Sequence, residues 1–349
     1  MTSRSYAYYR LPYADTYTMV ESEQPPVQLE SLDEVGSMPG FVIAPFQSTD
    51  DCPALLISAD STTTRRLLPA QEGAQQTPLQ EITSPDSPYS YAFDAFHRAV
   101  EKRDFVKLVL ARKKVVALAQ RMELDDPVSM RPLFERACRL YPRLMVMLYS
   151  TPLSGTWLVA SPEILLDGKG RSLHTVALAG TMQFREGLVE WSEKNRHEQN
   201  IVEQYIEHIL GQVSSDVLKD GPVTMRAGNL VHLRTDFRFH LAPKFTVGSL
   251  VRNLHPTPAV CGMPMHEAAD FISRHEGLDR RYYSGFSGPV DIEGETHLYV
   301  SLRCAELTET PDGTEAVLYA GGGIMPESDC NSEWLETESK MRTIQYVLQ

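Results

Sequence analysis

The sequence predicts an α+β fold with antiparallel sheets. Short β-rich runs follow one another between residues 143 and 180, and Pro and Gly separate them as in hairpins. Between residues 288 and 323, strand-like runs alternate with the tight turns EGE and TPDG, as in a β-meander. Helical patterns stand between these runs of strands, which is the arrangement of an α+β protein.

The N-terminal third predicts little regular structure. Residues 1–60 hold two strand candidates, FVIAPF at 41–46 and PALLIS at 53–58. Residues 61–89 are rich in Thr, Gln, Pro and Ser and hold few apolar positions, which predicts a mobile loop. The main body of the protein should therefore be formed by residues 90–349.

Regular elements are expected throughout this main body. Phe93, Phe96 and Val100 have helical spacing, and the strand-like run FVKLVLARKKVVAL follows them. Further strands are expected at RLMVMLYS, GTWLVA, HTVALAG, GPVDI, HLYVSLRCAEL and EAVLYAGGG, and further helices at 192–210, from Val247 onward and in the C-terminal stretch SDCNSEWLETESKM. Asn331 or Ser332 could cap the last helix.

The composition is that of an ordinary soluble globular protein. Of the 349 residues, 42% are hydrophobic and 23% are charged, with no apolar run long enough to span a bilayer and no secretory signal. The cysteines are odd in number and show no C-x-x-C pair, which predicts free thiols and a reducing, cytoplasmic setting. They are Cys52, Cys138, Cys261, Cys304 and Cys330.

The net charge of −13 argues against nucleic acid or an anionic membrane surface as the partner, because both need a positive surface. An anionic small molecule would need local cations. A metal ion or a few placed Arg and Lys side chains could overcome the field of the whole chain in this way.

Two ionisable residues lie in apolar stretches. Burial of Lys107 in FVKLVLAR would lower its pKa and make it a general base. Burial of Glu163 in ASPEILL would keep its carboxyl protonated as a general acid. The alternatives are an edge-strand lysine that faces water and a first-turn glutamate of a helix that starts at Ser161 and Pro162. These stretches alone leave both alternatives open.

A carboxylate also lies on the apolar face of a predicted helix. From Glu198, steps of four, three and four residues reach Val202, Tyr205 and Ile209, which predicts that Glu198 is buried. Two buried carboxylates on helices far apart in the sequence, Glu198 and Glu336, are the kind of oxygen ligands that Mg²⁺ uses.

The C-terminal helix carries a polar line where a core stripe would be apolar. Glu333, Glu336 and Lys340 fall on one face because they are three and four residues apart. The alternative to a binding role is a solvated face with a Glu336–Lys340 ion pair.

Two further features could bind an anion. Arg303 in VSLRCA alternates with the inward positions of a central-looking strand and could clamp a carboxylate. Gly321–Gly323 offers bare backbone N–H groups at a strand end, although a bulge or tight bend would also explain these glycines.

With these stretches in this order, the sequence resembles the chorismate-utilising enzymes, which include isochorismate, salicylate, anthranilate and aminodeoxychorismate synthases. The resemblance covers residues 91–349 and rests on KLVLAR, ASPEILL, ALAGT, KNRHEQ, VHLRT, HPTPAVCG, YYSGFSGPVD, VSLRCA, AGGGI and SEWLETESK. It implies a single chorismate-binding domain over residues 1–349, with two antiparallel sheets flanked by helices as in anthranilate synthase component I. It also implies chorismate, a dianion, as the substrate and Mg²⁺ as the cofactor.

The resemblance implies a role for each candidate residue. Lys107 looks like the base that activates water, and Glu163 looks like the acid that protonates the departing 4-hydroxyl. The implied metal residues are Glu198 and Glu336, with Glu333 beside them and Lys340 assisting the ion in holding the ring carboxylate. The implied substrate-binding residues are Arg303, Tyr283, Gly321, Gly322 and Gly323 at the enolpyruvyl carboxylate, Gly180, Thr181 and His232 around the ring, and Ala259 near the pyruvyl group.

Two positions favour isochorismate synthase within the family. Ala179 in ALAGT stands where aminodeoxychorismate synthases usually carry a nucleophilic Lys, so water must attack the ring. Ala259 in HPTPA stands in place of a Thr that is similar to the one lyase members use. The segment QLES at 28–31 resembles the tryptophan-binding segment of anthranilate synthase, but it stands alone.

We therefore expect an Mg²⁺-dependent enzyme that interconverts chorismate and isochorismate, as a monomer that requires no glutaminase subunit and no redox cofactor. The alternatives are salicylate synthase, anthranilate synthase component I and a non-catalytic chorismate sensor. The presence of both Lys107 and Glu163 speaks against a sensor, because binding alone needs neither. The sequence does not assign the product to menaquinone, siderophore or salicylate synthesis.

Overall fold

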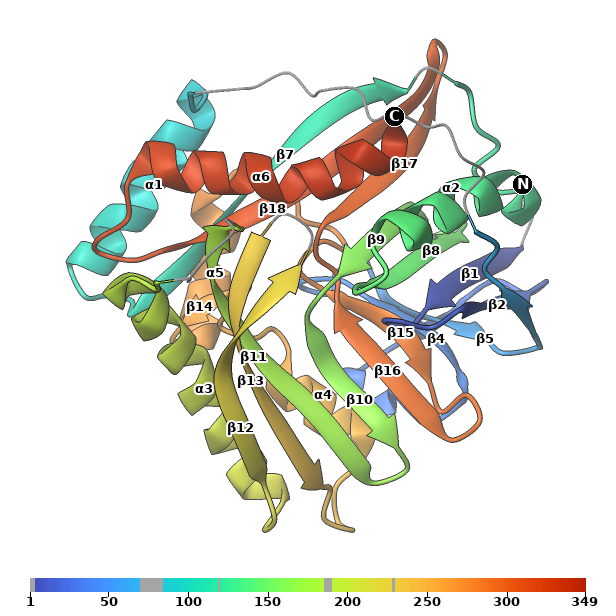
Figure 1. Cartoon of the computed structure of the whole chain (residues 1–349), viewed down its shortest axis with the longest axis horizontal. Helices are drawn as coiled ribbons and strands as arrows, with labels where there is room; N and C mark the ends of the chain where they lie inside the picture. The colour runs from blue at the N-terminus through green and yellow to red at the C-terminus, as the bar shows by residue number, and fades with distance from the viewer. Residues whose placement is uncertain (1–3, 70–83, 119, 185–189, 228–229) are drawn as a thin grey trace.

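The fold consists of two antiparallel sheets with helices packed against them (Figure 1). The computed structural model describes residues 4–69, 84–118, 120–184, 190–227 and 230–349. Each sheet has nine strands, and every recorded strand pairing is antiparallel. The predicted α+β class is confirmed.

The strands of each sheet come from distant parts of the chain. From edge to edge, the first sheet contains β14 (Gly262–Met263), β7 (Lys107–Leu118), β18 (Gly313–Ile324), β17 (Cys304–Thr310), β9 (Gly155–Ser161), β8 (Met145–Thr151), β1 (Ser5–Arg10), β2 (Thr16–Ser22) and β6 (Ser61–Arg66). The second contains β12 (Leu218–Ala227), β13 (Leu230–His240), β11 (Ser172–Gln183), β10 (Ile164–Lys169), β16 (Glu295–Val300), β15 (Phe286–Val290), β4 (Gly40–Ala44), β5 (Ala54–Ser58) and β3 (Val27–Leu29).

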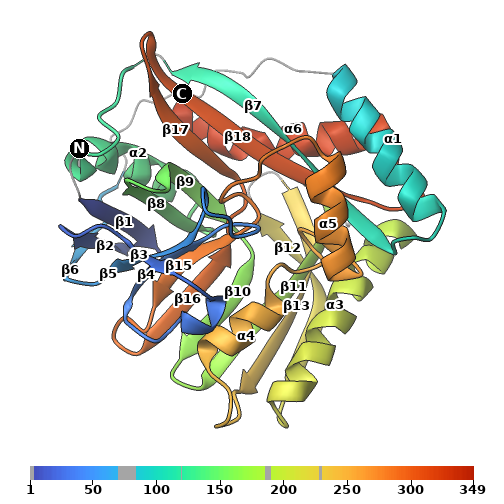
Figure 2. The same cartoon turned by 180° about the vertical axis from the view of Figure 1, so that it is seen from behind.

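The helices cover the sheets from outside, as Figures 1 and 2 show from opposite sides. They are α1 (Ser87–Glu101), α2 (Pro127–Leu140), α3 (Glu193–Val213), α4 (Val247–Leu254), α5 (Met265–His275) and α6 (Cys330–Leu348), with the short 3₁₀ helix η1 (Leu32–Glu34). Helix α6 packs on β18, and α3 packs on β11 and β13. Tyr149 and Trp157 of the first sheet share one buried apolar cluster with Phe41 and Val176 of the second, so the sheets pack face to face.

The N-terminal part is more regular than its sequence predicts. Besides the two expected strands it forms β1, β2 and β3, and every residue of β1 is buried although its sequence, SYAYYR, is half polar. Because β1 pairs with β8 and β4 pairs with β15, this part contributes strands to both sheets rather than forming a separate layer.

The mobile loop was predicted to cover residues 61–89, but regular structure occupies both ends of this range. Residues Ser61–Arg66 form β6, whose β-branched threonines pair with β2, and Ser87 begins α1. Residues 70–83 lie outside the described part of the chain.

The run HLYVSLRCAEL, predicted as one strand, is two strands in different sheets. It forms β16 in the second sheet and β17 in the first. The chain crosses between the sheets at Leu302 and Arg303, where Arg303 has a positive φ of 47° and its carbonyl accepts a hydrogen bond from Ala160 N at 3.1 Å. Arg303 therefore does not lie on a central strand, and this prediction is wrong.

Two other local predictions need correction. Helices α2 and α5 were not anticipated. The cap of α6 is Asp329 rather than Asn331 or Ser332, because the Asp329 carboxylate accepts the Ser332 N–H at 2.9 Å.

The five cysteines are unpaired, as predicted. Among the helices in the described ranges, none is long and apolar enough to cross a membrane.

Candidate active site

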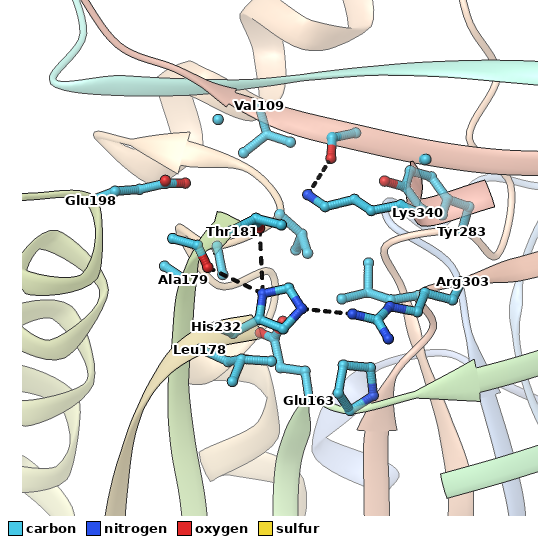
Figure 3. A pocket seen from close by; sticks show the side chains of 18 residues that line it. Val109, Glu163, Leu178, Ala179, Thr181, Glu198, His232, Tyr283, Arg303 and Lys340 are labelled. Atoms are coloured by element: carbon cyan, nitrogen blue, oxygen red, sulfur yellow. Dashed lines mark hydrogen bonds between the residues drawn. The ribbon is translucent and has the colours of Figure 1, made fainter. Parts of the chain in front are cut away.

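A small cavity lies where the two sheets meet α3 and α6 (Figure 3). Most of the predicted site residues line it, namely Glu163, Gly180, Thr181, Glu198, His232, Ala259, Tyr283, Arg303, Gly321, Gly323 and Lys340. The other four, Lys107, Gly322, Glu333 and Glu336, lie next to these lining residues. Residues from β11, α3, β13, β18 and α6 are thus brought together, but the roles assigned to them stay predictions.

Lys340 restricts the space inside. The cavity volume is about 60 Å³, enough for a few water molecules. The Lys340 ammonium lies across it, donating to the Gly321 carbonyl at 2.8 Å and pairing with Glu336 Oε1 at 2.7 Å. A molecule as large as chorismate would therefore require Lys340 or its neighbours to move.

Lys107 is buried, which rules out the alternative of an edge-strand lysine facing water. Its side chain is 0% exposed because β14 covers β7 and the strand is not an edge. The Lys107 Nζ lies 2.8 Å from Glu198 Oε1, so the two side chains form a buried ion pair. Within the described ranges no acceptor other than Glu198 is recorded for the Lys107 ammonium.

Glu163 is also buried, and no helix starts beside it. It lies in the short link between β9 and β10, and its side chain is 2% exposed. Burial raises the pKa of this carboxyl to about 7, although the nearby Lys107 charge and a hydrogen bond from Thr257 act in the opposite direction. A carboxyl that is still protonated near neutral pH can act as a general acid.

Three carboxylates approach the backbone of Gly322 and Gly323. Glu198 comes from α3, and Glu333 and Glu336 come from α6. A side chain at Gly322 would lie 2.9 Å from Glu333 Oε2 and 3.9 Å from Glu336 Oε1, and one at Gly323 would overlap Glu198 Oε1. These two glycines therefore make room for the protein's own carboxylates, which the sequence did not predict.

Each of these carboxylates has a lysine as its counter-charge. The pairs are Glu198 with Lys107, Glu333 with Lys194, and Glu336 with Lys340. Although burial disfavours its charge, the Lys107 ammonium holds the pKa of Glu198 below its ordinary value. Burial and then the Glu336 charge raise the pKa of Glu333 to about 7. The ion pair given as the alternative for Glu336 and Lys340 thus exists. Lys340 lines the cavity, whereas Glu336 is 23% exposed rather than buried as predicted and lines a neighbouring, more open pocket.

The donor set fits a magnesium ion by its chemistry. No group of three or more His, Cys, Asp or Glu side chains within the described ranges is arranged closely enough to hold a metal as it stands. Carboxylate oxygens are nevertheless the ligands that Mg²⁺ prefers. The raised pKa of Glu333 reflects burial first and then the Glu336 charge, and a cation would relieve this second contribution. Such an ion would take over the part of the counter-charge that the lysines now supply. The predicted Mg²⁺ requirement stays a prediction.

Glu198 was predicted to be buried on the apolar face of its helix, but its burial is incomplete. The buried residues of α3 include its neighbours Gln199 and Val202, and the Glu198 side chain is 12% exposed. Glu198 lies at the edge of that face and is turned toward the cavity, as Figure 3 shows. Tyr205 and Ile209, which were expected to be buried, are partly exposed.

The opposite side of the cavity holds a cation that has no carboxylate partner among the residues that the structure describes. The Arg303 guanidinium donates to His232 Nε2 at 2.6 Å and to the Ala227 carbonyl at 3.0 Å, and both acceptors are neutral. His232 Nδ1 therefore carries the proton and donates to the Gly180 carbonyl at 3.1 Å. Burial and the Arg303 charge hold the pKa of His232 well below its ordinary value, and burial lowers that of Arg303 to about 10. Arg303 stays charged at neutral pH and is available to an anion.

Gly180 is required by the close approach of α3. It adopts a φ of 65°, the register of β11 against β13 shifts between Ala179 and Thr181, and a side chain would lie 3.2 Å from Asn195 Cβ and from its carbonyl oxygen. Tyr283 restricts position 321 in a similar way, because a side chain in place of Gly321 would lie 2.9 Å from the Tyr283 hydroxyl.

Sequence reasoning missed three residues that support the site. Gln199 is buried, accepts the Ala179 N–H at 2.8 Å and donates to the Ala177 carbonyl at 3.1 Å, which fixes α3 on β11. Thr257 donates to Glu163, and Lys194 pairs with Glu333. Each lies within or beside a motif already noted, KNRHEQ or HPTPAVCG, but nothing in the local pattern indicates its partner.

Comparison with known proteins gives a consistent family match. A family model described as chorismate binding enzyme matches residues 43–349. The chain is 34% identical over 200 residues to the isochorismate synthase EntC of Escherichia coli, an alignment that covers 54% of this chain and 50% of the relative. The chain thus spans only about half the length of this curated relative.

Two solved structures share the fold. The menaquinone-specific isochorismate synthase MenF of Escherichia coli superposes with a TM-score of 0.78 at 22% identity, covering 100% of this chain and 90% of that one. Anthranilate synthase component I of Streptococcus pneumoniae superposes with a TM-score of 0.69 at 14% identity, covering 97% and 89%. At these identities the similarity establishes the architecture, including its anthranilate synthase component I-like form.

Proposed function

This chain belongs to the chorismate-binding enzyme family, and we propose that it is an isochorismate synthase, which interconverts chorismate and isochorismate. The observation that carries the proposal is that two buried groups capable of proton transfer lie close to one cavity: Glu163 lines it, and Lys107 lies next to the lining residue Glu198. The pKa of about 7 for Glu163 suits a group that must both give and take a proton near neutral pH. The 34% identity with an isochorismate synthase supports the same assignment.

In the proposed reaction, a hydroxyl group is exchanged between two ring carbons. Lys107, acting as the base, takes a proton from water while the water oxygen bonds to C2. The ring double bonds shift, the C4–O bond breaks, and Glu163 donates its proton to the departing oxygen, which leaves as water. Because water enters and water leaves, the reaction is reversible and needs no ammonia-supplying subunit and no redox cofactor.

The substrate carboxylates would bind at the two ends of the cavity. Arg303, whose recorded acceptors are neutral, offers two-pronged hydrogen bonding to the enolpyruvyl carboxylate, with the Tyr283 hydroxyl beside it. Glu198 and Glu336 would hold Mg²⁺, with Glu333 beside them, and the bound ion would supply positive charge for the ring carboxylate. Lys340, whose ammonium now pairs with Glu336, would turn to that same carboxylate.

The small side chains of the cavity support an isomerase over the other family reactions. Ala179 lines the cavity and offers no amine that could attack the ring in place of water. Ala259 also lines it and offers no hydroxyl near the pyruvyl group. We therefore propose that pyruvate is retained in the product.

The test is incubation of the purified chain with chorismate and Mg²⁺, followed by chromatography and mass spectrometry. We expect isochorismate, with oxygen from ¹⁸O-labelled water at C2, and no pyruvate. Stoichiometric pyruvate would instead assign a salicylate synthase, and an aminated product at high ammonium would assign an anthranilate synthase. Tight binding of chorismate with no product would assign a sensor.

A further inference from the structure

The turn that follows α4 brings a hydroxyl group to the Glu163 carboxyl. Thr257 Oγ1 donates to Glu163 Oε1 at 3.3 Å, and both side chains are buried, at 4% and 2% exposure. Within the described ranges this is the one recorded side-chain hydrogen bond to that carboxyl. The distance is long for a hydroxyl donor, as contacts of acid–base groups often are before substrate binds.

The Thr257 turn is held rigidly from several sides. The Thr257 carbonyl accepts the N–H groups of Val260 at 3.1 Å and Cys261 at 3.0 Å. The Val260 carbonyl accepts from the buried Arg280 guanidinium at 2.8 Å, and the Cys261 carbonyl accepts from Val109 N at 2.8 Å. The hydroxyl therefore approaches Glu163 from a fixed position in the fold.

The backbone of Glu163 is fixed in the same way. Its N–H donates to Ser161 Oγ at 3.2 Å, and its carbonyl accepts Val300 N at 3.0 Å. The remaining freedom of this residue lies in its side chain, and Thr257 contacts one of the two carboxyl oxygens. Glu163 lines the cavity, whereas Thr257 does not, so Thr257 can act on a ligand only through Glu163.

We propose that Thr257 is a positioning residue for the general acid: its hydroxyl holds Glu163 Oε1, so that the transferred proton resides on Oε2. A hydroxyl suits this task because it can donate to Oε1 both when the group is a carboxylate and when the acid carries its proton on Oε2, so the pair stays hydrogen-bonded in both protonation states. This inference rests on the proposed acid role of Glu163, and it adds a residue to which the family resemblance assigned no role.

The charges that surround Glu163 set the direction of the expected pH effect. Burial raises its pKa, whereas the Lys107 ammonium on β7, the Thr257 hydroxyl and the Lys340 ammonium on α6 lower it. Removing the hydroxyl removes an interaction that favours the carboxylate. The acid should then stay protonated to higher pH and be a weaker, less well-oriented donor.

The experiment compares Thr257→Val, which keeps the shape and loses the hydroxyl, with Thr257→Ser, which keeps the hydroxyl. For Thr257→Val we expect kcat to fall about tenfold, as for the loss of one oriented hydrogen bond, with KM unchanged. The alkaline limb of its kcat/KM profile should move to higher pH. Thr257→Ser should retain the original kcat and the original limb.

Thr175→Val is the matched control, because its buried hydroxyl donates to the Leu165 carbonyl at 2.8 Å away from the cavity. It reports what loss of any buried threonine hydroxyl does to the fold. A fall in kcat of equal size in Thr175→Val, or in Thr257→Ser, would overturn the proposal. An unshifted alkaline limb in Thr257→Val would do the same.

A substrate-free readout separates this inference from the reaction itself. The protonated Glu163 carboxyl can be identified by infrared difference titration as the band that Glu163→Gln removes. The pH midpoint at which this band disappears should rise in Thr257→Val and stay constant in Thr257→Ser, whatever product the enzyme makes. A midpoint that is the same in all three proteins would refute the role of Thr257 even in an active isochorismate synthase. Absence of isochorismate with the expected midpoints would refute only the proposed reaction.

Discussion

The two ends of the cavity handle buried charge in opposite ways. At the α3 and α6 end, three carboxylates each have a lysine partner, so the cluster is close to neutral before any ligand binds. At the β13 and β17 end, the acceptors of Arg303 among the described residues are both neutral, so no carboxylate in that part of the chain compensates its charge. The carboxylates of one end can exchange a lysine partner for another cation, whereas the arginine of the other end has no anionic partner within the described ranges.

This difference explains how an acidic chain can bind a dianion. The formal net charge is −13, yet the Arg303 end offers a desolvated positive charge that attracts a carboxylate. The other end becomes attractive only when a cation joins its carboxylates or when Lys340 leaves Glu336. We therefore expect the Arg303 end to govern binding of the substrate by itself and the carboxylate end to govern its dependence on metal.

The largest effect should come from the acid that lies between the ends. Glu163→Gln should reduce kcat by about 10²–10⁴-fold while chorismate binding, measured by calorimetry, stays within about twofold, because proton transfer acts in the transition state. Lys107→Ala should likewise reduce kcat while chorismate binding is retained. In the unmodified enzyme, turnover should decline as pH rises through about 7, since Glu163 then loses the proton that it must donate. Equal losses in kcat and in binding would place Glu163 at one of the two ends instead.

The next effect should come from the uncompensated arginine. Arg303→Met should raise KM for chorismate roughly 10–100-fold, as for the loss of a charge-assisted hydrogen bond. Mg²⁺ binding in the absence of substrate should not change. Arg121→Met is the control, because Arg121 carries the same charge in an exposed pair with Glu309. If both variants raise KM equally, long-range charge and not the Arg303 site attracts the substrate.

A smaller effect is expected at the carboxylate end. Glu336→Gln should weaken Mg²⁺ binding roughly tenfold, and by linkage it should weaken chorismate binding in the presence of Mg²⁺ but not in its absence. Glu198→Gln should behave alike, and Glu309→Gln on the surface should have no effect. Calorimetric titrations that give the same Mg²⁺ affinity for Glu336→Gln and for the unmodified chain would contradict a metal role for this end.

The smallest effect on activity is expected for Gln199, which supports the helix that carries Glu198 and should act mainly on stability. Gln199→Leu should lower the free energy of unfolding by about 1–3 kcal/mol, because the Ala179 N–H and the Ala177 carbonyl lose their partner in a buried setting. Chemical denaturation measures this change. Gln212→Leu is the control, since Gln212 bonds to His208 in an exposed part of the same helix. A stability equal to that of the control would mean that α3 is held by its apolar face alone.

The sequence predicted the residues of the site better than their surroundings. Apolar runs around Lys107 and Glu163 indicated burial, and both are buried. The pattern could not show that Lys107 faces Glu198, because their contact joins β7 to a helix more than 70 residues away. Local patterns report which face of an element is apolar, whereas partners across the fold depend on tertiary packing.

The fold was missed where polar sequences are buried or apolar ones are exposed. All of β1 is covered on both faces although half of its residues are polar, and β6 is exposed along its whole length. Neither shows the alternation that identifies a strand. Helix α2 had a recognisable start, since Asp126 caps it and Pro127 occupies its first turn, but Pro132 inside the helix obscured the pattern.

The backbone at Arg303 has a consequence for engineering. Its φ of 47° lies in the left-handed region, which costs a non-glycine residue about 1–2 kcal/mol and costs glycine almost nothing. Arg303→Gly should thus relax the chain at the crossing while leaving an opening the size of a guanidinium group beside His232. Free guanidinium added to the solution could enter that opening and restore the missing charge by chemical rescue. The cation on which substrate capture depends would then be a soluble additive whose concentration sets the activity.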